Sequence, residues 1–309
     1  MATASEGGPE LVGSVEESPE RVNESPIMTA PLSSSITLCA DDYGLAPGVS
    51  QAILALIERG RLQATGCMTG SPYWPSAAPM LRVLEHKADM GVHLTLTDQT
   101  PLGTMPDLAP NGRFPSLPVL LKRALTRRLD RAEIAAELER QIDSFEQHFG
   151  RPPDFLDGHH HVHQLPVIGE VVVDLWRRRL GERGWIRSCV EPLPAILRRG
   201  VDPVRALVIS SLGLGFRRRL RALDIPHNTS FRGVYDFSGR VPFDRLFRRF
   251  TDAPGERTLM MVHPGKVDDA LRAADTLTRQ REVEFAFLAS DSCAFSLAER
   301  KITLRRLFP

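Results

Sequence analysis

The stretch DFLDGHHHVH, residues 154–163, indicates both the fold and the chemistry of this chain. Its apolar pair Phe155-Leu156 is typical of the last part of a buried strand. Four of the chain's nine histidines follow within five residues. Alternate side chains of an extended backbone share a face, so we expect one of these histidines to point away from the rest. The three on one face would be His159, His161 and His163, and the fourth is His160.

Imidazole side chains grouped in this way predict a metal site. Neutral imidazole binds borderline divalent metals, and histidine-rich tracts are used for that purpose. The competing interpretations are a solvent-exposed histidine tract and a purification tag. A tag does not fit a mid-chain position with Asp157 and Val162 inside the run. We therefore expect a short strand to end here and to direct two or three imidazoles into one cleft.

On both sides of this stretch, short apolar strands alternate with amphipathic helices, a pattern that favours a parallel sheet. No GxGxxG motif follows the first strand and the chain contains no P-loop. About seven strand–helix units without a phosphate loop predict an α/β fold, a distorted (β/α) TIM-like barrel of parallel strands. Strands are expected near residues 35–40, 64–70, 89–96, 154–158, 185–190, 231–237 and 257–262. Helices are expected near 47–57, 76–87, 130–149, 242–250 and 267–281, with a further one ending near 184.

The domain organisation predicted from composition is simple. Residues 1–34 are rich in Glu, Ser, Pro and Gly and lack a hydrophobic period, so we expect a disordered tail. Residues 35–309 are then expected to form a single domain. Prolines interrupt the stretch between residues 98 and 118, which precludes long regular elements there. We expect this loop to cover a cleft, because long loops in compact domains are usually functional.

Charge and cysteine content exclude several classes of protein. The 39 Lys and Arg residues balance 38 Asp and Glu residues, which gives no argument for a nucleic-acid partner. The four cysteines form no CxxC pair, so neither a thiolate metal site nor a disulfide framework is indicated and a reduced, cytoplasmic environment is expected. No apolar run reaches the roughly 18–20 residues of a membrane span, so we expect no integral membrane contact.

Four expected strand ends carry polar side chains that a buried strand does not need. They are Asp41-Asp42, His93, the histidines after Asp157, and His263. Each of these positions has a purely structural explanation when it is considered alone, because histidines occur in cores and aspartates in turns and helix caps. If these residues formed no common site, all four structural explanations would have to be correct at once. Since the carboxyl ends of barrel strands form the active-site face, we predict one site built from all four.

These motifs resemble the signatures of the YdjC-like carbohydrate deacetylases, a family that includes the chitooligosaccharide deacetylases. The resemblance rests on ADDYG at 40–44, GVHLTLT at 91–97, DGHHHVH at 157–163 and HPG at 263–265, and it extends from about 35 to 290. Tyr43 stands where the family usually has Phe, and Gly158 where Ser is common. The resemblance implies a distorted barrel, a homodimer and a divalent metal, usually Mg²⁺.

The resemblance also implies roles for individual residues. The implied metal ligands are Asp42, His93 and His159, and the implied catalytic base and acid are Asp41 and His263. Substrate contacts are expected from His161, His163 and Tyr43, with His161 and His163 as alternative metal ligands. Asp157 is expected to orient a histidine. Two histidines and one aspartate suit Zn²⁺ or another transition metal better than Mg²⁺, which prefers oxygen ligands. The ligand types and the resemblance therefore leave the metal open between these ions.

The implied function is metal-dependent removal of N-acetyl groups from an amino sugar or oligosaccharide. One alternative is another barrel metallohydrolase such as a phosphoesterase, although only Lys266 supplies a cation beside the motifs. The other is a non-catalytic sugar- or metal-binding protein, which needs neither Asp41 nor His263. The arginine clusters 177–179 and 217–219 are interpreted as solvated helix faces. Apolar residues just before the second cluster add the hypothesis of docking to anionic lipid, which would make a glycolipid a candidate substrate.

Overall fold

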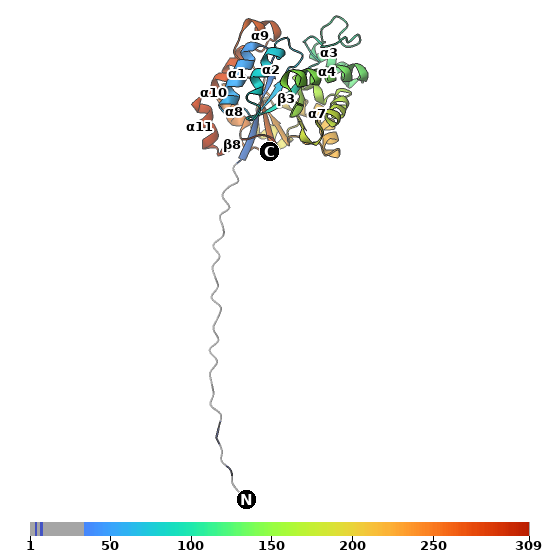
Figure 1. Cartoon of the computed structure of the whole chain (residues 1–309). Helices are drawn as coiled ribbons and strands as arrows, with labels where there is room; N and C mark the ends of the chain where they lie inside the picture. The colour runs from blue at the N-terminus through green and yellow to red at the C-terminus, as the bar shows by residue number, and fades with distance from the viewer. Residues whose placement is uncertain (1–3, 5–6, 9–33, 309) are drawn as a thin grey trace. The chain divides into compact units, whose positions relative to one another are not determined.

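Parallel strands form a curled sheet at the centre of the fold, with helices around it (Figure 1). The computed structural model describes residues 4, 7–8 and 34–308, so the expected disorder of residues 1–34 lies almost entirely outside the described part. The strands are β1 (Ser34–Tyr43), β2 (Ala64–Cys67), β3 (Asp89–Leu94), β4 (Phe155–Gly158), β5 (Trp185–Ile186), β6 (Ser230–Arg232), β7 (Thr258–Val262) and β8 (Ile302–Leu304). Each one lies at or near a place where the sequence predicted a strand, except β8.

The order of the strands is that of an incomplete barrel. Seven of them follow the order β5-β4-β3-β2-β1-β7-β6, all with parallel neighbours, and β8 adds to one end of β1. A single bridge between Ile186 and His227 lies where the two outer strands approach each other. β1 is buried along nearly its whole length, as expected for a parallel sheet covered on both faces. The predicted TIM-like α/β fold is therefore confirmed, as a curled half-barrel.

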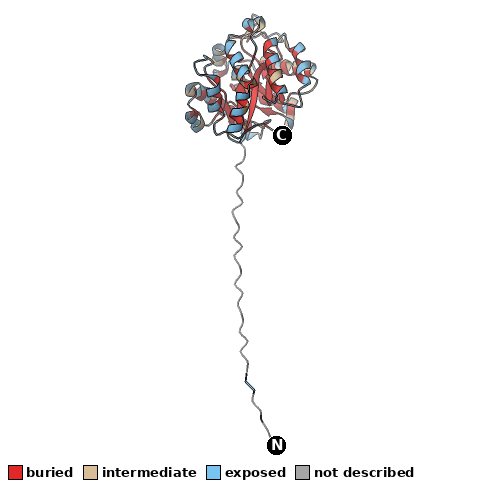
Figure 2. Cartoon of the chain, turned by 90° about the vertical axis from the view of Figure 1, so that its left-hand side faces the viewer, coloured by how far each residue is buried: buried red, intermediate tan, exposed pale blue. Residues whose placement is uncertain are grey.

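The surrounding helices bury one face each and expose the other, as Figure 2 shows by its red and pale blue sides. They are α1 (Pro47–Glu58), α2 (Trp74–Arg82), α3 (Leu117–Leu125), α4 (Arg131–Phe149), α5 (Ile168–Leu175), α6 (Leu193–Arg199), α7 (Pro203–Ala222), α8 (Phe243–Phe250), α9 (Asp269–Ala274), α10 (Arg279–Ala289) and α11 (Asp291–Glu299). None of the helices in the described residues is long and apolar enough to cross a membrane.

Helix α4 shows how local sequence sets both a helix end and a loop. Asp130 accepts the backbone N–H of Glu133, which is the expected N-cap. The Glu133 carboxylate does not complete a capping box, because it accepts the backbone N–H groups of Asp107 and Leu108 instead. It therefore fastens the proline-rich loop to α4. The predicted absence of long regular elements in that loop is confirmed up to residue 116.

Two expectations about local structure are wrong. The helix predicted over 267–281 is two helices, α9 and α10, because the Asp275 carboxylate accepts the Leu277 N–H and binds Arg281 at the break. The histidine run is not extended, because β4 ends at Gly158 and a 3-10 turn, η1 (His159–Gln164), follows. Its second and third residues have φ of 52° and 59°. The histidines therefore diverge in several directions, and the predicted alternation of faces does not occur.

Candidate active site

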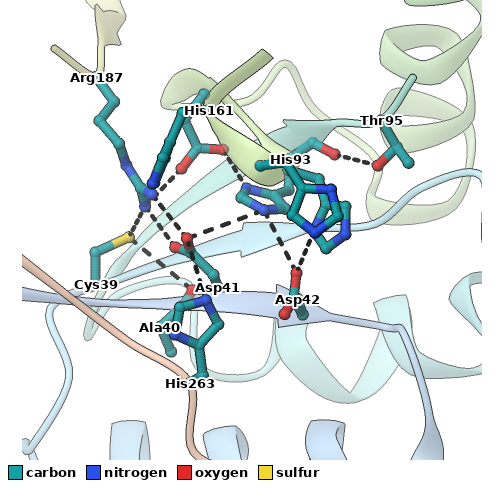
Figure 3. Close-up of polar contacts among 12 residues, drawn as sticks. Cys39, Ala40, Asp41, Asp42, His93, Thr95, His161, Arg187 and His263 are labelled. Atoms are coloured by element: carbon teal, nitrogen blue, oxygen red, sulfur yellow. Dashed lines mark hydrogen bonds and ion pairs between the residues drawn. The ribbon is translucent and has the colours of Figure 1, made fainter. Parts of the chain in front are cut away.

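The four strand ends that the sequence singled out converge at one end of the sheet (Figure 3). Asp41 and Asp42 lie in a bulge of β1, where one extra residue separates its pairings with β2. Asp42 has φ of 71°, a left-handed conformation that a non-glycine residue rarely adopts. The bulge breaks the alternation of an extended strand, so both adjacent carboxylates are buried in the same site. Strain of this kind is often found at functional sites.

Three side chains from β1, β3 and η1 form a group that could hold a metal ion. The Asp42 Oδ1 atom lies 3.0 Å from His159 Nδ1 and 3.4 Å from His93 Nε2. One potential ligand atom from each residue lies within 4.8 Å of those of the other two. Three protein ligands leave coordination positions for water and substrate, as catalytic metal sites require. The donor set fits a divalent ion.

Asp157 on β4 orients one of these potential ligands. Its Oδ1 atom lies 2.7 Å from His93 Nδ1, on the opposite side of the ring from Asp42. A proton on Nδ1 leaves the Nε2 lone pair directed at the ligand group, which is the usual arrangement behind a metal-binding histidine. Burial alone would lower the pKa of His93, but the carboxylates of Asp157 and Asp41 outweigh it and raise that pKa to about 9. A bound ion would compete with the second proton.

Asp41 is held by a guanidinium group and faces a histidine. Arg187 donates to both of its carboxylate oxygens, at 2.8 and 2.6 Å, and its Nη2 lies 2.6 Å from Asp157 Oδ2. Burial would raise the pKa of Asp41, but Arg187, followed by His93 and His263, lowers it below its ordinary value. The His263 Nε2 atom lies 4.0 Å from Asp41 Oδ2. Asp41 is therefore an ionised carboxylate between the ligand group and His263.

The loop after β7 holds His263 beside this group. Its backbone N–H donates to Glu284 Oε2 at 2.6 Å, and Tyr235 donates to the other oxygen of the same carboxylate. Its ring packs edge-on against Phe237, with ring centroids 5.1 Å apart. Burial lowers the pKa of His263 to about 4, so this imidazole is neutral at neutral pH.

A cavity of about 640 Å³ opens over the whole group. Its polar end is lined by Asp41, Asp42, His93, His159 and His263. The remainder is lined mainly by apolar side chains of α3, α7 and the segments around β6 and β7. The cavity therefore combines carboxylates and imidazoles at one end with a mainly apolar remainder.

The YdjC-like protein family model matches residues 35–299. The chain belongs to the YdjC-like family. Among curated relatives, the chitooligosaccharide deacetylase of Yersinia pestis is 38% identical over 265 residues, covering 84% of this chain and 93% of the relative. The carbohydrate deacetylase of Geobacillus stearothermophilus is 29% identical over 268 residues, covering 86% and 93%.

A solved structure from Enterococcus faecalis, assigned provisionally to cellobiose-phosphate cleavage, has the same fold. It aligns with a TM-score of 0.68 at 23% identity and covers 89% of this chain and 97% of its own length. At this identity the likeness supports the fold alone. It agrees with the curled half-barrel described above.

The remaining residues expected to bind substrate lie in different places. His161 lines the cavity, with its Nδ1 atom 3.5 Å from Cys189 Sγ. His163 is fully buried, and its Nε2 atom lies 2.9 Å from the Arg187 carbonyl oxygen. The buried Tyr43 hydroxyl donates to the Ala77 carbonyl oxygen at 2.7 Å. Neither His163 nor Tyr43 lines the cavity, so their placement does not support the expected contact with substrate.

Two arginines of the site were missed from the sequence. Arg187 follows the short strand β5, and a charged residue at the end of an apolar strand was the available signal. Arg281 lies in α10 and donates to Asp42 Oδ2 at 2.6 Å and to Asp275 Oδ2 at 2.7 Å. No local pattern distinguishes it from other helix arginines, because its carboxylate partner lies 239 positions away along the chain.

A second group of potential ligands is already occupied by a cation of the protein itself. Cys39, Asp41 and Asp157 also lie close enough together to hold an ion. The Arg187 guanidinium contacts all three, with its Nη2 atom 3.0 Å from Cys39 Sγ. Burial raises the pKa of the Cys39 thiol well above its ordinary value. This group therefore serves to hold Arg187 and Asp41 in place.

Proposed function

We propose that this member of the YdjC-like family is a metal-dependent carbohydrate deacetylase that hydrolyses the acetamide of an N-acetylated amino sugar. The observation that carries the proposal is that Asp41 and His263, with Oδ2 and Nε2 4.0 Å apart, line the same cavity as the ligand group Asp42, His93 and His159. A binding protein needs the ligand group alone. A hydrolase also needs a base for water and an acid for the leaving amine, and both types of group are present.

The three residues of the ligand group would hold the divalent ion. When bound, such an ion supplies Lewis-acid chemistry, polarising the acetamide carbonyl and lowering the pKa of a water molecule. The resemblance favours Mg²⁺, whereas two imidazole ligands favour Zn²⁺ or another transition metal. The proposal leaves this choice to reconstitution with each ion. Homodimerisation and a cytoplasmic location stay predictions from the sequence.

Asp41 is proposed as the base that takes a proton from the attacking water. Arg187 keeps it ionised and fixes its orientation through both oxygens. Its lowered pKa makes it a weak base, which favours passing the proton on to a better acceptor. The candidate acceptor outside the ligand group is the neutral imidazole of His263, whose Nε2 atom lies 4.0 Å from Asp41 Oδ2.

His263 is proposed as the acid for the departing nitrogen. An amide nitrogen leaves poorly unless it is protonated. Because the pKa of His263 is lowered to about 4 in the resting site, the proton it donates would be the one released by water through Asp41. The C–N bond then breaks as the nitrogen takes that proton, giving acetate and a free amine. Phe237, packed against His263 at the edge of the cavity, offers an aromatic surface to the sugar ring.

The phosphoesterase alternative is weakened by how the arginines are used. Arg187 and Arg281 are the guanidinium groups closest to the proposed reaction centre, and both are buried against carboxylates. A phosphate would have to displace those carboxylates to bind either one. A substrate panel that measures released acetate and released phosphate separates the two functions directly.

The central test of the proposal is the Asp41→Asn variant. It should still bind the divalent ion, since Asp42, His93 and His159 are intact. Acetate release from N-acetylglucosamine oligomers should fall by roughly 10²–10⁴-fold, the scale of general acid–base groups. Near-normal turnover in this variant would exclude Asp41 as the base. Metal binding without acetate release by the wild-type protein would favour the non-catalytic sugar- or metal-binding function.

A further inference from the structure

The cavity continues beyond the reaction centre as an aliphatic arm between two helices. On one side are Leu117 and Leu121 of α3, and on the other are Val208, Ile209 and Leu212 of α7, with Leu165 also part of the lining. The α7 residues recur at helical spacing, so they form one continuous stripe on that helix. We define these six residues as the aliphatic arm.

Gln164 and Arg205 are the polar side chains of this part of the cavity, and each makes one polar contact through its nitrogen atoms, while the buried Gln164 Oε1 has no hydrogen-bond partner among the described residues. Gln164 donates to the Ile209 carbonyl oxygen at 3.2 Å. Its Oε1 atom lies close to Gly213, where an added Cβ would be only 2.3 Å away, so it is turned toward the α7 backbone. Arg205 is held by Asp202 at 3.0 Å. The aliphatic arm therefore offers few groups for the hydroxyls of a second sugar ring.

The aliphatic character extends from the arm to the outer surface of the same two helices. Val208, which lines the arm, is itself 53% exposed. Val119 on α3 and Val204 on α7 are 49% and 71% exposed. Lys122 follows Leu121 on α3 and is exposed, and it forms no ion pair within residues 34–308. Exposed aliphatic side chains on both helices, together with the exposed cation next to Leu121 in the sequence, suit an aliphatic chain attached to a polar or anionic head group.

We propose that the substrate is an amphipathic glycoside, an N-acetylated amino sugar carrying an aliphatic chain that lies in the aliphatic arm. The proposal rests on the proposed deacetylation and adds the substrate class. The sugar would lie at the end of the cavity with Phe237 and His263, where an aromatic face and the polar groups are. The chain would run between α3 and α7 toward the outer surface.

The test compares two glycosides that differ only in chain length. Acetate release is measured from methyl and octyl N-acetylglucosaminides, both as monomers, with the metal-loaded full chain. Each buried methylene adds up to roughly fourfold in affinity, so we expect kcat/KM to be at least tenfold higher for the octyl compound. The gain should lie mainly in KM, because the chain contacts the ground state and the transition state alike.

A matched pair of α7 variants tests whether the higher kcat/KM for the octyl compound depends on the aliphatic arm. Leu212→Ser should lower the ratio of kcat/KM for the octyl compound to kcat/KM for the methyl compound toward one. Leu214→Ser is the control, because Leu214 is 45% exposed on the same helix and does not line the cavity. Equal kcat/KM for both glycosides, or equal effects of the two variants, would overturn the proposal and leave the deacetylase function standing.

Binding measurements separate this proposal from the function it rests on. If neither glycoside releases acetate, calorimetric titration of the wild type and Leu212→Ser with both compounds shows whether the aliphatic arm binds the alkyl chain. Tighter octyl binding that Leu212→Ser abolishes would support the aliphatic arm while deacetylation fails. Binding independent of chain length would overturn the arm as well. When the octyl compound is preferred and Leu212→Ser abolishes that preference, which supports the arm, anionic vesicles that carry the same sugar on a lipid distinguish a membrane source of substrate from a soluble glycoside.

Discussion

The two carboxylate oxygens of Asp42 have different partners, and that division fixes how the residue can act. Oδ1 faces the two histidines of the ligand group, at 3.0 and 3.4 Å. Oδ2 accepts from Arg281 at 2.6 Å. The arginine therefore favours a carboxylate that presents one oxygen to an ion and keeps the other away from it. Together with the left-handed backbone at Asp42, this contact makes Arg281 a positioning residue.

Replacing Arg281 should weaken metal binding by the folded protein, because Asp42 loses the contact that orients its carboxylate. In Arg281→Gln the Asp42 carboxylate loses its fixed orientation, and we expect metal affinity to fall roughly 10- to 100-fold, the usual effect of removing a group behind a ligand. Competition with a chromophoric chelator measures this without any turnover. Arg272→Gln is the control, since Arg272 is exposed and pairs with Asp269. Equal affinities in the two variants would show that Arg281 does not position Asp42.

At the scale of single elements, β3 carries a titratable group at each end. His93 lies at the site, while Asp89 begins the strand and accepts from Trp185 Nε1 at 3.2 Å. Burial, with a contribution from Asp154, raises the pKa of Asp89 to about 6. Because the pKa of Asp89 in the folded state exceeds the ordinary value of about 3.9, protonation of its carboxyl group stabilises the folded protein. This contribution to stability is complete only below about pH 4. The contribution is lost as the pH rises through 6.

Asp89→Asn should therefore change how stability depends on pH. The amide keeps an acceptor for Trp185 but does not ionise. We expect the variant to gain stability relative to the wild type between pH 4 and pH 8, by up to about 3 kcal/mol for a shift of about two pKa units. Chemical denaturation at several pH values measures the difference. A difference that stays constant across this range would mean that Asp89 is not the titrating group.

In the whole molecule, the local sequence pattern predicted the strands, whereas contacts between residues far apart in the sequence determine the geometry of the site. The alternation of strands and helices, and the polar residues at strand ends such as Asp41 and His263, were readable because each depends on a few neighbouring residues. The turn at His159 was not readable, because the left-handed backbone of the next two residues depends on tertiary packing. Arg187 was missed for a related reason, since its carboxylate partner on β1 lies 146 positions away.

Arg187 also joins several strands at the end of the sheet that carries the site. It follows β5, binds Asp41 of β1 and Asp157 of β4, and is fully buried. Removing one partner of a buried ion pair leaves uncompensated charge, which costs about 3–5 kcal/mol. Here two carboxylates would lose their cation together. Arg187→Met, which keeps most of the apolar length, should therefore lower the free energy of unfolding by at least about 3 kcal/mol.

Comparison with two other variants separates this role from surface charge and from catalysis. Arg178→Gln removes an exposed partner of Glu139, and surface pairs contribute about 0–1 kcal/mol, so its stability should stay close to that of the wild type. Asp41→Asn leaves Arg187 paired with Asp157 and should be less destabilised than Arg187→Met. Urea denaturation of all three variants gives the order. If Arg187→Met is as stable as Arg178→Gln, the strand ends are held together by apolar packing, and the buried charges act only in the chemistry of the site.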